Sequence, residues 1–291
     1  MILVFTNGVY DCNNNVFYDN ENIPADAINL QNDYDSDGNI VVRYHFEFDF
    51  IQTNESILIH NFLHYQKHLP SDITNVILSY CSNWEFIETP YFDRLMEVNF
   101  EEKERKLFYI FLGRLFHHFS EKDNWGIIPI IYGQENTIET ILEHFLGNYK
   151  LCIGRYGIEC VMPSDSIWSG LVSIVGCEGT STRAMVNTIN DLMNNRNHTY
   201  GRSMYSEQTL LLEDPKFIFL AEPENEDYAE FQFNYLEEEN VLAFGFNTVM
   251  TEVEYIRNGI FNEFTSLIRK SNMAYLEACN LYEDKDMLLN S

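Results

Sequence analysis

The spacing of hydrophobic positions changes along the chain, and the first fifty residues follow a period of two. The apolar run Ile2–Phe5 leads into the turn signal formed by Asn7 and Gly8. Val41–Phe50 alternates aromatic with charged residues, which is typical of a half-buried strand. Segments 13–15 and 33–38, rich in Asn, Asp and Gly, predict loops between these strands.

From about residue 55 the apolar positions recur at intervals of three and four. This spacing predicts helices over Ile57–Tyr65, Asp72–Tyr80 and Glu101–Phe119, with Pro70 and Pro90 as breaks between them.

After residue 127 short apolar runs alternate with helical patterns. Strands are predicted at Ile127–Tyr132, Leu171–Gly176, Lys216–Ala221 and Val241–Phe246, with helices at Thr137–Leu146 and Thr182–Met193. Such alternation predicts an α/β fold with a parallel sheet covered on both faces. Thr251–Leu289 is again predicted helical. The resulting domain prediction is a β-rich segment (1–55), a helical collar (56–122), the sheet domain (123–250) and a helical tail (251–291).

Composition sets limits on the partners. The 291 residues are 45% hydrophobic, enough for a substantial core, and carry 45 Asp and Glu against 18 Lys and Arg, a net charge of −27. This charge opposes binding of free nucleic acid and favours basic partners. None of the six cysteines forms a C-x-x-C pair, so neither a zinc site nor a disulfide framework is expected, and a reducing environment is favoured. No apolar stretch is long enough to cross a bilayer, and no signal peptide is expected.

Residues 133–140 read Gly-Gln-Glu-Asn-Thr-Ile-Glu-Thr and match the frame of a phosphate-binding loop, G-x-x-x-x-G-K-[ST], in part. Gly133 and Thr140 occupy their positions. Ile138 stands where the second glycine allows close backbone approach, and Glu139 stands where lysine would contact the phosphates. A carboxylate at that position repels a triphosphate, so the sequence predicts a relic loop that has lost its activity.

Several motifs carry a resemblance to a known family. Phe5–Asp11 is similar to an F-x-N-G-V-x-D opening, and Phe111–Phe116, Glu121–Trp125 and Ile128–Gly133 are similar to the helix and first strand that lead into a phosphate loop. Together they resemble the helicase half of the poxvirus-type primase–helicases of large DNA viruses, a branch of the superfamily 3 helicases. The resemblance extends from residue 2 to about residue 280. It implies a P-loop NTPase-like (AAA+/superfamily 3) sheet domain.

The resemblance also assigns positions to the ATPase chemistry. Glu178 stands where the family holds Mg²⁺ and polarises water, and Glu222 stands where the family has an asparagine that senses the γ-phosphate. Residues 222–239, where the family places basic residues including an arginine finger, contain eight acidic residues and neither Lys nor Arg. Because phosphoryl transfer depends on positioned cations, these exchanges predict loss of catalysis.

The functional hypothesis is therefore a catalytically inactive helicase- or ATPase-like viral protein that acts as a scaffold, regulatory or virion-associated subunit. The resemblance implies other viral proteins as partners, basic ones among them, and a location in the host cytoplasm or the virion. No cofactor, metal, membrane or free nucleic acid is expected, and a hexameric ring is disfavoured. One alternative is an active DNA helicase that uses ATP and Mg²⁺. Another is an acidic DNA mimic that binds basic proteins.

Two groups of histidines admit a further interpretation. His60, His64 and His68 share one face of a predicted helix at a spacing that can chelate a transition metal, although a solvated polar stripe is the preferred interpretation. His117 and His118 close the predicted helix Glu101–Phe119, where an imidazole suits the negative helix end and is expected to act as a cap.

Overall fold

The computed structural model describes two kinds of segment: nearly continuous stretches at both ends and in the middle of the chain, and short strands between them. In chain order these are residues 2–24, 33–34, 40–41, 46, 48–51, 83–117, 122–133, 150–154, 157–160, 168–169, 173–176, 198–203, 209–213, 219–220, 241–246 and 253–290. The predicted helices within 57–80, 137–146 and 182–193 lie outside the described residues, as do His60, His64 and His68.

The chain begins with a three-stranded antiparallel sheet in the order β1-β2-β3, formed by β1 (Ile2–Phe5), β2 (Gly8–Asp11) and β3 (Val16–Asp19). The predicted strand and turn are confirmed, with the turn one residue earlier than expected because Gly8 already pairs with Phe5. A Cβ on Gly8 would lie 2.2 Å from the Tyr18 carbonyl oxygen, so this position has no room for a side chain. The predicted loop at 13–15 is a turn in which Asn15 has φ of 53°.

The segment 41–50 differs from the predicted strand. Its first residue belongs to β5 (Ile40–Val41), which pairs with β4 (Asp33–Tyr34), so the predicted loop 33–38 begins inside a strand. The described residues 46 and 48–50 lie outside any regular strand. They run beside β1 and are joined to it and to Thr6 by two isolated backbone hydrogen bonds, Phe46 N to Val4 O at 2.8 Å and Thr6 N to Phe48 O at 3.2 Å. The predicted aromatic face is nevertheless present: the rings of Phe46, Phe48 and Phe50 lie 4.9, 5.8 and 5.0 Å from that of Phe5.

Helices form the second part of the described molecule. They are the 3₁₀ turn η2 (Trp84–Phe86), α4 (Pro90–Asn99), α5 (Glu102–Arg114), α9 (Val253–Leu281) and α10 (Lys285–Leu289). The tail is helical as predicted. In the described part of the chain, no helix combines the length and the apolar character needed to cross a membrane.

Helix α4 was not predicted, because Pro90 was interpreted only as a break. Proline is favoured at the first helical position, where its missing N–H costs nothing, and Pro90 is the first residue of α4. The free N–H groups that follow are bound from α9: both carboxylate oxygens of Glu263 accept from Tyr91 N, at 2.9 and 3.1 Å, and one accepts from Phe92 N at 3.1 Å. Local sequence around α4 cannot indicate this cap, because Glu263 lies 172 positions after Tyr91.

Helix α5 begins as predicted, with a capping box between Glu101 and Glu104, and ends at Arg114, five residues earlier than predicted. Beyond it the chain tightens into i to i−3 hydrogen bonds, such as His117 N to Arg114 O at 3.1 Å. This tightening turns Phe116 into the core, where its side chain is fully buried.

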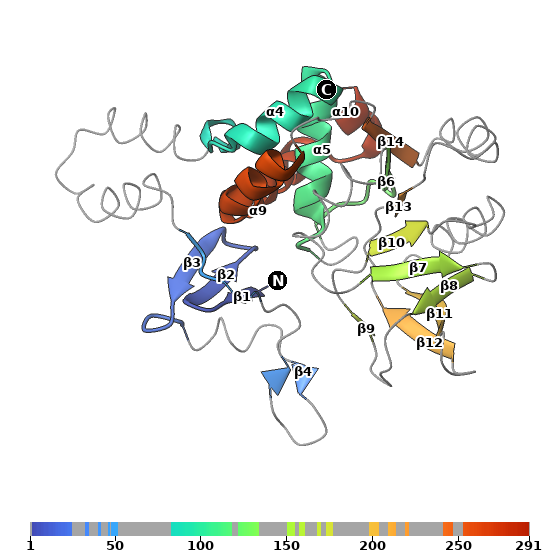
Figure 1. Cartoon of the computed structure of the whole chain (residues 1–291), viewed down its shortest axis with the longest axis horizontal. Helices are drawn as coiled ribbons and strands as arrows, with labels where there is room; N and C mark the ends of the chain where they lie inside the picture. Colours follow the sequence, from blue (N-terminus) through green and yellow to red (C-terminus); the bar gives the residue numbers. More distant parts are fainter. Residues whose placement is uncertain are drawn as a thin grey trace.

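One hydrophobic cluster of described side chains joins these parts. Helix α9 packs along α5 and α4 and also reaches the N-terminal strands (Figure 1). Gly113 makes the closest contact, since a Cβ there would lie 1.9 Å from the carbonyl oxygen of Ser271. The cluster includes side chains from all four predicted domains, such as Phe5, Phe111, Phe244 and Phe264. The described side chains of these four segments therefore share one core, and the domain boundaries stay a prediction.

Among the described residues, the largest sheet contains nine strands in the order β14-β6-β13-β10-β7-β8-β11-β12-β9. They are β6 (Ile128–Gly133), β7 (Lys150–Gly154), β8 (Gly157–Cys160), β9 (Trp168–Ser169), β10 (Ser173–Gly176), β11 (His198–Ser203), β12 (Thr209–Glu213), β13 (Phe219–Leu220) and β14 (Val241–Phe246). All four predicted strands are present, as β6, β10, β13 and β14. They are neighbours, and each adjacent pair among them is parallel.

The remaining strands were not predicted. β7 continues the parallel group beside β10, whereas the β7–β8 and β11–β12 pairs are antiparallel. Because the segments expected to cover the sheet lie outside the described residues, the α/β P-loop-like fold class stays a prediction.

Candidate functional site

The predicted ATPase positions follow the ends of three adjacent parallel strands. Gly133 is the last residue of β6, Glu178 comes two residues after β10, and Glu222 comes two residues after β13. These strands pair in register, with Ile130 opposite Phe219 and Phe219 opposite Ile174. Because parallel strands end at the same edge of a sheet, the three loops leave from one edge.

The strand order gives this edge a further property. In the parallel group β14-β6-β13-β10-β7, the chain leaving β6 continues toward β7 on one side, whereas the chain leaving β13 continues toward β14 on the other. Connections from neighbouring strands that depart in opposite directions create a crevice at the carboxyl ends of the strands, which is where ligands bind in open α/β sheets. The strand order therefore predicts such a position between the end of β6 and the end of β13.

Of the predicted loop itself, the structure describes Gly133, which pairs with Phe246 of β14. Ile138, Glu139 and Thr140 lie outside the described residues, and so do Glu178, Glu222 and the acidic stretch 222–239. Their roles stay predictions. The described residues contain no group of His, Cys, Asp and Glu side chains that could hold a metal ion.

A buried ion pair fixes the chain just before β6. Arg114, at the end of α5, binds both carboxylate oxygens of Asp123, through Nε at 2.9 Å and Nη2 at 2.8 Å, and its Nη1 donates to the Ile127 carbonyl at 2.6 Å. The two side chains are 8% and 0% exposed. A bidentate pair that also binds the backbone fixes the approach of the chain into β6.

Helix α9 completes this network. The hydroxyl of Tyr275 donates to Asp123 Oδ2 at 2.6 Å, and Trp125 N donates to Asp123 Oδ1 at 3.1 Å. Burial, followed by the charge of Asp123, raises the pKa of Tyr275 well above its ordinary value, so the hydroxyl stays protonated and donates. Asp123 therefore accepts hydrogen bonds from α5, from its own loop and from α9.

The opening motif Phe5–Asp11 also serves the fold. Asn7 donates from Nδ2 to the Phe50 carbonyl at 3.0 Å and accepts from Phe50 N at 2.8 Å, which reproduces a pair of strand hydrogen bonds. Asp11 accepts from the backbone N–H of Asn13 at 2.9 Å and so stabilises the next turn. Among the described residues, the motifs behind the family resemblance hold the structure together.

The expected capping role of His117 is wrong. The side chain is fully buried, with Nε2 donating to Asn272 Oδ1 at 2.7 Å and the ring 4.9 Å from that of Tyr275. Asn272 in turn donates to the Cys12 carbonyl at 2.8 Å and to the Tyr10 hydroxyl at 3.1 Å. Since α5 ends three residues earlier, His117 joins α9 to the N-terminal sheet. His118 lies outside the described residues.

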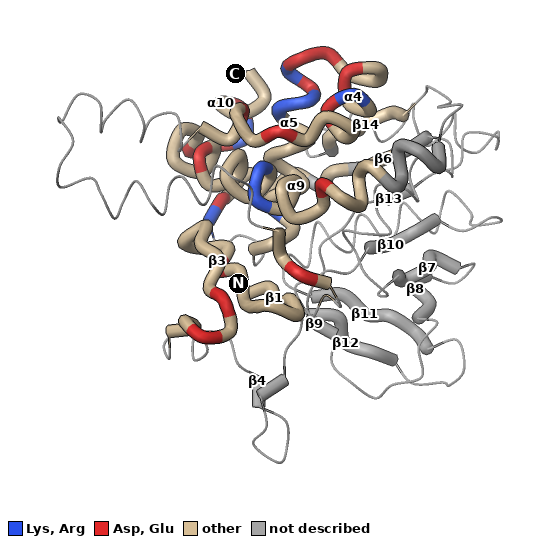
Figure 2. The backbone as a smooth tube through the Cα atoms, turned by 60° about the vertical axis from the view of Figure 1, so that its left-hand side comes forward, with Lys and Arg blue, Asp and Glu red and all other residues tan. Residues whose placement is uncertain are grey.

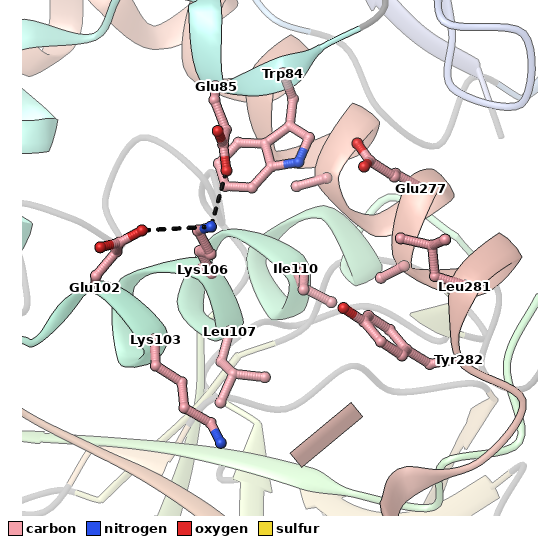
Figure 3. Close-up of a pocket in the computed structure, with 12 residues that line it drawn as sticks. Trp84, Glu85, Glu102, Lys103, Lys106, Leu107, Ile110, Glu277, Leu281 and Tyr282 are labelled. Carbon is pink, nitrogen blue, oxygen red and sulfur yellow. Dashed lines mark ion pairs between the residues drawn. The ribbon is translucent and has the colours of Figure 1, made fainter. Parts of the chain in front are cut away.

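The sequence did not predict a cavity of about 390 Å³ between η2, α5 and α9 (Figure 3). Its walls combine apolar and charged side chains: Trp84, Glu85, Glu102, Lys103, Lys106, Leu107, Ile110, Ala274, Glu277, Ala278, Leu281 and Tyr282. Because these residues come from η2, from α5 and from the end of α9, far apart in the sequence, no local motif marks the cavity. Acidic positions also lie along the N-terminal strands and the helices (Figure 2).

No protein-family model matches the sequence, and no curated protein matches it. Among solved structures, the A form apo structure of the NrS-1 C-terminal region is a weak neighbour, with a TM-score of 0.41 and 14% sequence identity. The match covers 69% of this chain and 48% of that one, so this chain spans about half the length of that structure.

Proposed function

We propose that the protein is a helicase- or ATPase-like chain without ATPase activity that acts as a scaffold or regulatory subunit. The observation that carries this proposal is Glu139 at the lysine position of the loop that follows β6, beside Ile138 at the second glycine position. Phosphoryl transfer is catalysed by positioned cations. A carboxylate and a bulky side chain at these positions oppose both nucleotide binding and catalysis.

The arrangement of the parallel strands supports this interpretation. The loop that begins at Gly133 starts at the carboxyl end of β6, and Glu222 follows the neighbouring β13, on the two sides of the crevice expected from the strand order. The acidic replacements therefore follow the strands whose ends a nucleotide would contact.

The contrast between the two sets of motif residues supports a scaffold role. Asn7, Gly8, Arg114 and Asp123 each make contacts that stabilise the fold. The positions that an ATPase needs for its lysine and sensor asparagine carry glutamates instead. A chain that keeps the fold-stabilising residues but lacks the lysine and the asparagine of an ATPase retains a framework for binding other molecules.

Calorimetry of the full chain with ATP and Mg²⁺ tests the proposal. We expect no binding by the unaltered protein at micromolar nucleotide. Ile138→Gly combined with Glu139→Lys should introduce measurable binding, whereas Glu135→Lys, which makes the same charge change at a variable position of the motif, should not.

Micromolar binding of ATP and Mg²⁺ by the unaltered protein, together with no tightening in Glu139→Gln, would overturn the proposal. DNA-stimulated ATP hydrolysis in that case would establish the active helicase instead.

The net charge of −27 favours a second candidate, an acidic mimic of DNA that binds basic proteins. Binding of that kind involves many exposed charges and weakens steeply with added salt. Polylysine is a suitable probe: loss of binding between 50 and roughly 200 mM salt is expected for the mimic, and salt-independent binding would exclude it.

A further inference from the structure

The cavity between η2, α5 and α9 has a floor of buried apolar side chains and an exposed apolar edge. Leu107 and Ile110 of α5 face Ala274 and Ala278 of α9 across it, and Leu281 at its edge is 55% exposed. Figure 3 shows Leu107, Ile110 and Leu281 around the same space. Because burying exposed apolar surface is favourable, the exposed Leu281 at the edge favours an apolar group from another molecule.

The charges around the cavity are unequal, with three glutamates against two lysines. Lys106 Nζ lies 3.0 Å from Glu85 Oε1 and 3.5 Å from Glu102 Oε1, so this lysine is shared between two carboxylates. Glu277 forms no ion pair within the part of the chain that the structure describes. Burial, followed by repulsion from Glu85, raises the pKa of Glu277, whereas the charge of Lys106 lowers it. A cation placed beside Glu277 would relieve that repulsion.

Trp84 gives the cavity an aromatic wall. Its ring lies between the side chains of Glu85 and Glu277 (Figure 3). Cations bind favourably near an indole ring, and a guanidinium group both stacks on it and pairs with carboxylates. Lys103 lies at the other end of the cavity, beside Leu107 (Figure 3), away from Glu277.

We propose that this cavity binds a basic side chain of a partner protein, an arginine or lysine, together with an adjacent apolar residue. The cation would occupy the space between Trp84, Glu85 and Glu277, and the apolar residue would cover the exposed side chain of Leu281 at the edge of the cavity. The strongly negative chain is complementary in charge to such a partner. This inference rests on the proposed scaffold role and specifies the chemistry of its partner.

An NMR titration of the full chain tests the proposal. The probe is the peptide acetyl-Leu-Arg-Leu-amide, and its control carries citrulline, a neutral group of the same shape, in place of arginine. We expect the arginine peptide to shift the indole N–H signal of Trp84, which is assigned with Trp84→Phe. The citrulline peptide should bind about 5-fold more weakly, the upper range for one exposed ion pair.

Two variants sharpen the test in opposite directions. Glu277→Gln should weaken the arginine peptide about 2- to 5-fold, whereas Glu88→Gln, an equal charge change at an exposed residue outside the cavity, should leave it unchanged. Lys106→Met should tighten binding, because Glu85 and Glu102 lose their internal cation.

Several outcomes would overturn the proposal: an unshifted Trp84 signal, equal binding of the two peptides, or equal effects of Glu277→Gln and Glu88→Gln. None of them bears on nucleotide binding. Failure of the peptide titration is therefore distinguishable from failure of the inactive-ATPase proposal, which calorimetry with ATP decides separately.

Discussion

Arg114 and Lys106 of helix α5 are both ion-paired, but in opposite environments. At its end, Arg114 and Asp123 are 8% and 0% exposed and share their hydrogen bonds with the backbone and with Tyr275. Two turns earlier, Lys106 and Glu85 are each 47% exposed and line a cavity. The same chemical attraction therefore fixes the chain in one place and leaves a charged surface accessible in the other.

The two ion pairs differ in how much water surrounds their charges, and this difference decides the cost of losing one partner. A buried charge that loses its partner keeps its desolvation cost, whereas water takes over when an exposed pair separates. We therefore expect substitutions at the buried pair to affect folding, and substitutions at the exposed pair to affect binding with little effect on folding.

The largest effect is expected for Asp123→Asn. This change leaves the buried Arg114 guanidinium without its counter-charge and should lower the free energy of unfolding by about 3–5 kcal/mol. Urea unfolding followed by circular dichroism measures the loss. Asn124→Ala, at the exposed neighbouring position, is the matched control and should change stability little. A loss below about 1 kcal/mol for Asp123→Asn would mean that the Arg114–Asp123 pair contributes no more to stability than an exposed ion pair.

An intermediate effect is expected at Cys279, which lies in the same environment. Burial, and next the charge of Asp123, raise the pKa of its thiol from the ordinary 9.0 to about 11, while a hydrogen bond with Tyr275 opposes the rise. At pH 8 this pKa makes the thiolate fraction about 100-fold smaller than that of an ordinary thiol. Because alkylation requires the thiolate, Cys279 should react more slowly by about the same factor. Iodoacetamide labelling of the Cys279 peptide, followed by mass spectrometry against pH, measures this fraction.

The raised pKa of the Cys279 thiol also makes the stability of the fold depend on pH. The unfolded thiol ionises near pH 9, whereas the folded one keeps its proton up to about pH 11. The contribution of the protonated thiol to the free energy of unfolding is therefore fully present below about pH 9 and is lost as the pH rises toward 11. Cys279→Ser should remove this part of the alkaline loss of stability. Half-maximal labelling of Cys279 near pH 9 would contradict the expected burial.

The smallest effect on folding is expected for Lys106→Met. The change removes exposed ion pairs with Glu85 and Glu102 and should alter the free energy of unfolding by less than about 1 kcal/mol. Added salt should reduce even this difference, because exposed charges are screened. Urea unfolding at low and high salt measures both quantities, and a loss comparable to that of Asp123→Asn would remove the contrast between the two pairs.

Much of the regular structure could be predicted from local pattern. The four apolar runs that became β6, β10, β13 and β14 were visible because continuous hydrophobic runs are typical of strands in parallel sheets. The C-terminal helices were visible from their period. Strands such as β11 (His198–Ser203), which contains polar residues and a glycine, lacked that signal.

The contacts between distant segments could not be predicted. Glu263 caps α4 from another helix, Asn7 replaces strand hydrogen bonds with its side chain, and His117 faces Asn272 across the core. Each depends on packing that brings together residues far apart in sequence. For the candidate site, the sequence identified the loop frame and its replaced residues, whereas the binding position expected between the ends of β6 and β13 comes from the strand order.

The hydrogen bonds of Asn272 also bear on the order in which the chain folds. This residue binds the Cys12 carbonyl, 260 positions earlier in the sequence. Contacts across such separations raise the contact order, which slows folding because a long loop must close before the contact forms. During synthesis the N-terminal sheet leaves the ribosome well before α9 exists. The surface that Phe264 of α9 covers, at Phe46 and Phe48, therefore waits for its partner until late in translation.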